Sequence, residues 1–283
     1  RRGRMMTLQE FKKKKDFLIC VDSDGCAMDT MDIKHFQCFG PCMVEEWGLK
    51  QWAEPILTRW NDINLYTMTR GINRFKGLAM ALREIDGQYT RIAGIDELEQ
   101  WADSAPALSN DGLKVAIEAG GSEVLSKALN WSDKVNNRIN ALPFDAKKPF
   151  EGVLEGLKYA HSMADIAIVS SANLQAVEEE WTLYGLLDHV DILLAQNVGN
   201  KAYCIQELLK KGYDQDKVIM TGDAPGDLEA ARSNNVFYYP ILVRHEGESW
   251  KEFRETAVDK LADSTYGGDY QQKKIAAFLD NLK

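Results

Sequence analysis

The sequence lacks the features of a membrane or secreted protein. No apolar run approaches the ~20 residues that a transmembrane helix requires. The basic opening Arg1-Arg2-Gly3-Arg4 is not followed by the apolar segment of a secretory signal, so we interpret it as an expression remnant or a frayed start. The five cysteines are odd in number and show no C-x-x-C spacing, which favours reduced thiols over a disulfide framework. We therefore expect a soluble, cytoplasmic protein.

Basic residues are also fewer than acidic residues. The 283 residues contain 34 Lys and Arg against 43 Asp and Glu, which gives a formal net charge of -9. This balance argues against broad binding to nucleic acid or to anionic membranes, and an anionic substrate would need cations gathered locally. The hydrophobic content of 45% is ordinary for a globular chain, and the length allows one large domain or two smaller ones. The oligomeric state is not predicted.

Several catalytic motifs are missing. The sequence contains no G-x-x-x-x-G-K-[ST], G-x-G-x-x-G, H-E-x-x-H or G-x-S-x-G pattern. These absences exclude a P-loop nucleotide hydrolase, a simple dinucleotide fold and an α/β-hydrolase. The four histidines are scattered without ligand spacing, so we expect them to be structural and do not expect zinc.

What is present is an alternation of short apolar runs with helical patterns. Uninterrupted apolar strands separated by helices are typical of a parallel sheet that is covered on both faces. We therefore predict an α/β fold with a Rossmann-like parallel sheet. The expected strands are Phe17–Val21, Ile166–Val169, Val190–Leu194, Val218–Thr221 and Val236–Val243, and the expected helices are Leu174–Leu187, Ala202–Lys211 and Asp227–Ser233.

One long interval interrupts this alternation. Residues 30–144 follow the first strand, read as mostly helical, and are too long for a connection within a compact sheet. We predict that they form an inserted helical domain, and that residues 1–29 and 145–283 together form the core domain. Five of the seven tryptophans lie in the insertion, where we expect them mainly to pack between helices rather than to line a substrate pocket.

Polar side chains follow four of the expected strands or begin the next helix. The carboxyl ends of strands in an open α/β sheet are where ligands bind. Each element has an ordinary structural alternative: a turn for Asp22 and Asp24, helix capping for Ser170 and Asp227, and an exposed surface charge for Lys201. The elements are Asp22-Ser23-Asp24-Gly25, Ser170-Ser171, Lys201, and Gly222-Asp223 with Asp227.

Carboxylates gathered at one sheet edge would repel one another. Two like charges 4 Å apart cost about 4 kcal/mol at an effective dielectric constant near 20. Such a cluster needs a cation or raised pKa values, and an all-oxygen ligand set suits Mg²⁺. We therefore predict a magnesium site.

In this order, and each following a strand, the four elements resemble the motifs of the haloacid dehalogenase (HAD) superfamily. Because the interval from Ser170 to Lys201 is too short to hold a domain, the insertion after the first strand corresponds to a C1 cap, as in relatives of phosphoglycolate phosphatase and β-phosphoglucomutase. The resemblance implies a HAD core with an inserted helical C1 cap. From the negative net charge we expect no binding to nucleic acid or membrane.

The resemblance also implies roles for the motif residues. Asp22 would be the nucleophile that forms an aspartyl-phosphate. Asp24 would act as general acid and base, and it distinguishes the chain from the dehalogenases. Ser170, Ser171 and Lys201 would bind the phosphoryl group. Mg²⁺ would be bound by Asp22, Asp24 (through its backbone carbonyl) and Asp223, with Asp227 as a further ligand or as a neighbour of the ligands.

These roles predict a Mg²⁺-dependent phosphomonoesterase that hydrolyses a small phosphorylated metabolite. A phosphomutase or phosphotransferase that uses the same residues is the alternative, and a catalytically silent binding protein is a third. Specificity would come from the cap, where Arg70 and Arg74 are four residues apart and would share a helix face. We expect them either to bind a second anionic group of the substrate or to lie solvated on the surface.

Overall fold

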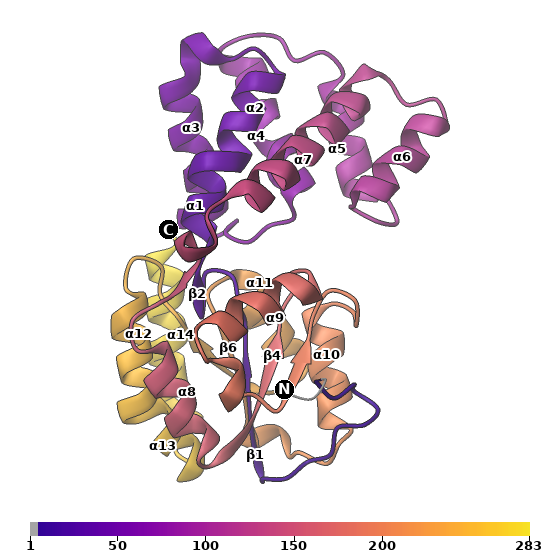
Figure 1. The fold of residues 1–283 in the computed structure, drawn as a ribbon. Helices are drawn as coiled ribbons and strands as arrows, with labels where there is room; N and C mark the ends of the chain where they lie inside the picture. Colours follow the sequence, from indigo (N-terminus) through magenta and orange to yellow (C-terminus); the bar gives the residue numbers. More distant parts are fainter. Residues whose placement is uncertain (1–4) are drawn as a thin grey trace. The chain divides into compact units, whose positions relative to one another are not determined.

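The chain divides into two units. The computed structural model describes residues 5–283, so the basic tetrapeptide Arg1–Arg4 lies outside the described residues. One unit contains the chain up to Thr30 together with Lys147–Lys283, and the other is Met31–Ala146 (Figure 1). Among the residues from 5 onward, no helix has the length and apolarity to cross a bilayer.

The first unit is built on a five-stranded parallel sheet. Its strands lie in the order β5-β4-β1-β6-β7, so β1 is central and pairs with β4 and β6. The predicted α/β fold is confirmed, although β5 begins two residues later and β7 is shorter than expected. The strands are β1 (Phe17–Val21), β4 (Ala164–Val169), β5 (Ile192–Leu194), β6 (Val218–Gly222) and β7 (Phe237–Pro240).

Helices cover this sheet. Ile19 and Val21 of β1 are fully buried in a core shared with residues of α8, α9 and α12. The intervening Leu18 and Cys20 are equally buried, as expected of a strand with both faces covered. The helices are α8 (Val153–His161), α9 (Leu174–Leu183), α10 (Lys201–Leu209), α11 (Pro225–Ser233), α12 (Glu246–Glu252), α13 (Val258–Ala262) and α14 (Asp269–Asn281).

A short two-stranded antiparallel sheet is formed by the segments on either side of the insertion. Strand β2 (Met28–Asp29) pairs with β3 (Lys148–Pro149), so Met28 lies opposite Pro149 and Asp29 opposite Lys148. The chain therefore leaves the sheet unit and returns to it through adjacent residues.

All the regular secondary structure of the second unit is helical. Trp60 and Trp131 are completely buried there, with ring centroids 6.0 Å apart in an edge-on arrangement, and Trp101 packs edge-on against Phe75. The packing role predicted for these three tryptophans is confirmed. The elements are α1 (Met31–Lys34), η1 (His35–Phe39), α2 (Gly40–Glu46), η2 (Lys50–Trp52), α3 (Ala53–Asn61), η3 (Asp62–Tyr66), α4 (Arg74–Gln88), α5 (Ile95–Ser104), α6 (Asn110–Glu118) and α7 (Glu123–Ala141).

Candidate active site

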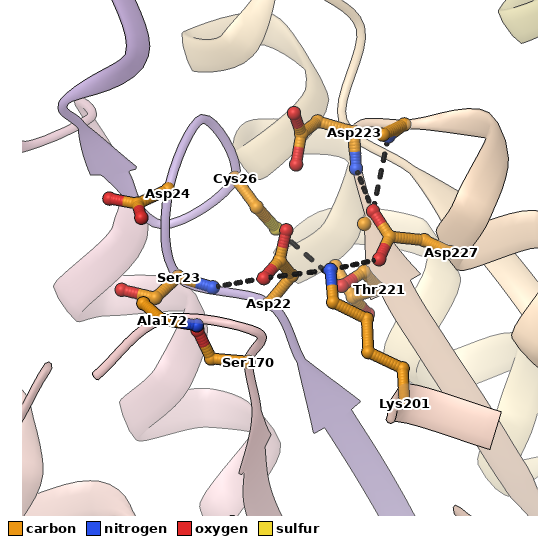
Figure 2. A network of polar contacts seen from close by, with 12 residues as sticks. Asp22, Ser23, Asp24, Cys26, Ser170, Ala172, Lys201, Thr221, Asp223 and Asp227 are labelled. Carbon is orange, nitrogen blue, oxygen red and sulfur yellow. Dashed lines mark hydrogen bonds and ion pairs between the residues drawn. The ribbon is translucent and has the colours of Figure 1, made fainter. Parts of the chain in front are cut away.

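Asp22 lies immediately after the central strand β1, where the sheet ends. Its side chain is almost completely buried, at 7% exposed. The Oδ1 atom accepts a hydrogen bond of 2.8 Å from the Ser23 amide and lies 3.1 Å from Nζ of Lys201 (Figure 2). Two donors on one oxygen fix the orientation of the carboxylate.

Asp24 is held in the tight turn that follows. Gly25 adopts a left-handed φ of 75°, which glycine tolerates without strain, and its amide donates to the Met28 carbonyl at 2.8 Å. The Thr30 hydroxyl donates a short hydrogen bond to Oδ1 of Asp24. Asp24 is partly exposed, in contrast to Asp22, so the turn presents the two carboxylates in different environments.

The loop after β6 brings two more carboxylates to the same edge. Asp223 is buried, and so is Asp227, whose Oδ2 accepts from the Asp223 and Ala224 amides at 3.0 and 3.1 Å. The helix α11 begins at Pro225 rather than at the predicted Asp227, so Asp227 is its third residue. Its carboxylate still caps the helix, because it satisfies the amides of the two residues that precede α11. Its other oxygen, Oδ1, lies 2.6 Å from Nζ of Lys201.

Lys201 connects the two loops. It is the first residue of α10, its side chain is only 17% exposed, and its ammonium contacts Asp22 and Asp227 together. The alternative of an exposed surface charge is therefore wrong. Burial alone would lower the pKa of Lys201, but Asp22 and Asp227 outweigh it and raise the pKa above its ordinary value. The ammonium therefore stays charged at neutral pH.

The cluster carries more negative charge than Lys201 neutralises. Burial raises the pKa of Asp22 well above its usual range; Lys201 opposes this rise, whereas Asp227 and Asp223 add to it. Three carboxylates beside one ammonium leave a formal excess of two negative charges, which one divalent cation would balance.

The donor set itself suits magnesium. Carboxylate oxygens of Asp22, Asp223 and Asp227 lie within 4.8 Å of one another. Hard oxygen donors of this kind favour Mg²⁺ over a soft transition metal. Both oxygens of Asp227 accept hydrogen bonds from the protein, so this carboxylate also holds Lys201 and the amides of Asp223 and Ala224 in place.

Ser170 follows β4 at the same end of the sheet. It is 2% exposed, its amide donates to the Leu194 carbonyl at 3.0 Å, and its Oγ accepts from the Ala172 amide at 3.0 Å. The capping alternative is wrong for this residue, because the Asn173 side chain caps α9 by accepting from the Ala176 amide. Ser171 is exposed.

The two arginines chosen from the helical unit do not share a helix face. Arg70 lies in the turn before α4 and Arg74 is the first residue of that helix, because Asn73 starts it by accepting from the Phe75 amide. Arg70 is 3% exposed and donates to the Leu65 carbonyl at 2.8 Å. The predicted shared face is therefore wrong, and so is surface solvation for Arg70.

Arg74 is bound to its own unit as well. Its Nη1 donates to Ser132 Oγ at 3.0 Å and to Asn136 Oδ1 at 2.8 Å, which ties α4 to α7. The guanidinium also lies 5.0 Å from the centre of the Phe39 ring. These contacts assign Arg74 a packing role, which the spacing of charges along the sequence did not indicate.

Sequence reasoning did not predict the roles of three residues that hold the motif side chains. Ser23 orients Asp22, Thr30 binds Asp24, and Gly222 leaves room for Asp227, since a Cβ at Gly222 would lie 2.4 Å from atoms of that side chain. Only Gly222 carried a signal in the sequence, because a glycine at the end of a buried strand indicates a close approach.

Comparisons with known proteins agree with this architecture. A family model described as haloacid dehalogenase-like hydrolase matches residues 99–240. A haloacid dehalogenase-like family hydrolase from Xanthomonas campestris is 13% identical, with a TM-score of 0.51 over 90% of this chain and 96% of that one. A protein from Lactobacillus delbrueckii subsp. bulgaricus, provisionally assigned as a phosphoglycolate phosphatase, is 14% identical, with a TM-score of 0.50 over 90% and 100%.

A third similar structure is a protein from Thermotoga maritima that is provisionally assigned as a β-phosphoglucomutase. It is 17% identical, with a TM-score of 0.46 over 87% of this chain and 97% of that one. No curated protein matches the chain significantly in sequence. At these identities, the two structures with TM-scores of 0.50 and above establish the fold.

Proposed function

The chain belongs to the haloacid dehalogenase-like hydrolase family, and within it we propose a Mg²⁺-dependent phosphomonoesterase that acts on a small phosphorylated metabolite. The observation that carries the proposal is the contact of Lys201 with both Asp22 and Asp227 at the carboxyl end of the sheet. A buried ammonium beside a carboxylate nucleophile lowers the repulsion that an incoming phosphate would otherwise meet.

Asp22 attacks phosphorus in the proposed reaction. A bond forms between its carboxylate oxygen and phosphorus while the bond from phosphorus to the ester oxygen breaks, which yields an aspartyl-phosphate and an alcohol. The Ser23 amide and Lys201 hold Oδ1 of Asp22, so the carboxylate is oriented before the substrate arrives.

Asp24 transfers protons in both halves of the reaction. It donates a proton to the leaving oxygen and then accepts one from the water that cleaves the aspartyl-phosphate, which restores Asp22 and releases phosphate. The hydrogen bond from Thr30 holds one oxygen of Asp24. Ser170 and Ser171, at the end of β4, are the proposed phosphate-binding residues along with Lys201.

Asp22, Asp223 and the backbone carbonyl of Asp24 would hold Mg²⁺, which supplies positive charge to the phosphoryl oxygens. Asp227 keeps Lys201 and the start of α11 in place. We further propose that the unit Met31–Ala146 serves as the cap that selects the leaving group.

The test is phosphate release from a panel of sugar, nucleotide and small-acid phosphates, with Mg²⁺ or with EDTA. Asp22→Asn should lower the rate by at least about 10³-fold, because it removes the nucleophile. Asp216→Asn is the matched control, since Asp216 is exposed in the short helix Gln215–Lys217, which precedes β6.

Two results would overturn the proposal. Conversion of sugar phosphate isomers that depends on Asp22 without phosphate release would establish a phosphomutase. Phosphate release that is unchanged in Asp22→Asn or in EDTA would show that another site or a contaminant is responsible.

A further inference from the structure

Two buried tryptophans hold the loop that carries Asp22 and Asp24. The indole N–H of Trp181, from α9, donates to Ser23 Oγ at 2.8 Å. The indole N–H of Trp250, from α12, donates to the Cys26 carbonyl at 2.9 Å. Both indoles are completely buried and belong to the core on one face of the sheet. The loop is therefore attached to the interior at two points.

Ser23 links the first of these points to Asp22. Its amide donates to Asp22 Oδ1 at 2.8 Å, and its carbonyl accepts from three amides of the same turn. Trp181 is thus separated from the proposed nucleophile by only one residue. The three amides are those of Cys26, Ala27 and Met28, at 3.2, 3.0 and 2.9 Å.

Burial makes the Trp181 hydrogen bond hard to replace. Ser23 is 0% exposed, so its hydroxyl has no access to bulk water when the indole donor is removed. A buried hydroxyl that loses its partner favours a rearrangement that finds another one. Because Ser23 is adjacent to Asp22, that rearrangement also moves the amide that orients the carboxylate.

We propose that Trp181 is a positioning residue for Asp22 that acts through Ser23, while Trp250 fixes the other end of the same loop. The effect on rate rests on the proposed phosphatase activity. Misplacement of a reacting group by 1 Å can cost about 10²-fold in rate. Loss of one such hydrogen bond should therefore lower kcat by about 10-fold or more and leave KM within about twofold, since Trp181 binds no substrate.

The experiment compares Trp181→Phe, Ser23→Ala and the double variant. Phenylalanine keeps an apolar ring but has no N–H, and alanine removes only the hydroxyl acceptor. Tyr266→Phe is the matched control, because it removes a buried hydroxyl that donates to the Tyr238 carbonyl at 2.6 Å in the same unit. The measurements are kcat, KM, melting temperature and amide hydrogen exchange in residues 22–28.

The expected result is a lower kcat in both single variants, with a double variant no slower than the slower single one. Tyr266→Phe should lose a comparable amount of stability without the loss of kcat. Exchange should rise in residues 22–28 of Trp181→Phe and Ser23→Ala. If Trp181→Phe does not fold, Ser23→Ala alone tests the same hydrogen bond.

Two outcomes would overturn the proposal: an unchanged kcat in Ser23→Ala, or equal loss of kcat in Tyr266→Phe. If the proposed phosphatase function is wrong, the results differ from these two outcomes. A wild-type protein inactive on all phosphate esters would refute the phosphatase. Exchange in residues 22–28 of the single variants would then decide whether Trp181 holds the loop, because unchanged exchange would refute that as well.

Discussion

A single methyl group at Gly222 should disrupt the whole carboxylate cluster. An added Cβ would lie 2.4 Å from Cβ, Cγ and Oδ2 of Asp227, a side chain that is itself completely buried. Ordinary contact between carbon atoms needs about 3.5 Å, so the Asp227 carboxylate would have to retreat by about 1 Å. Gly222→Ala is therefore a way to move Asp227 without changing any charged residue.

The magnitude follows from what Asp227 binds. A retreat of that size breaks or weakens its hydrogen bonds from the Asp223 and Ala224 amides and its contact with Lys201 at 2.6 Å. Hydrogen bonds to charged groups contribute about 1.5–3 kcal/mol each. With partial relaxation of the loop, we expect Gly222→Ala to lower the free energy of unfolding by about 3 kcal/mol, and to lower phosphate release because Lys201 loses one of its anchors.

Urea unfolding followed by far-UV circular dichroism measures the change in the free energy of unfolding. Gly226→Ala is the control, because Gly226 is the second residue of α11, four positions after Gly222, and a Cβ there would meet nothing within 4 Å. That variant should match the wild type or exceed it slightly, since alanine favours helix over glycine by about 1 kcal/mol. Equal stability of Gly222→Ala and Gly226→Ala would refute the argument from close approach.

Lys201→Met should lower the free energy of unfolding in EDTA by about 3–5 kcal/mol, because it leaves buried carboxylates without their cation; wild-type stability in urea would contradict this. Arg74→Met should cost about 2 kcal/mol through its lost bonds to α7, whereas the exposed neighbour Lys76→Met should cost almost nothing; calorimetry that gave both variants the same loss would refute the packing role. The cysteines are all buried, and burial raises the pKa of Cys204 to about 11. Alkylation at neutral pH should therefore label five thiols only after denaturation, and rapid labelling of the native protein, counted by mass spectrometry, would contradict this.

The sheet and its motifs could be predicted because each strand is a local pattern. Phe17–Val21 is apolar throughout and is followed at once by Asp22-Ser23-Asp24. Val218–Gly222 is apolar except for Thr221 and is followed at once by Asp223. The rule that parallel strands end at one edge then brings Asp22 and Asp223 together without any knowledge of packing.

Contacts between distant segments could not be predicted in the same way. Trp181 reaches Ser23 across 158 positions of the chain, and Arg74 reaches Asn136 across 62. Neither contact produces a periodic pattern in the sequence, because each contact depends on how whole helices pack against one another. The charge pattern at Arg70 and Arg74 was misleading for the same reason: their guanidinium groups donate to the Leu65 carbonyl, the Ser132 hydroxyl and the Asn136 amide oxygen, and the positions of these acceptors cannot be inferred from the spacing of charges along the sequence.

The pairing of β2 with β3 has a consequence for how the chain folds. Met28 lies opposite Pro149 and Asp29 opposite Lys148, so the segments that flank the insertion are held side by side. Closing a loop costs conformational entropy that grows with the length of flexible chain between its ends. Once Met31–Ala146 has folded, the chain between β1 and β4 behaves as a short connection, and the central strand pairs without ordering more than a hundred residues. We expect folding of the sheet to be fast only after the helices of the insertion have formed.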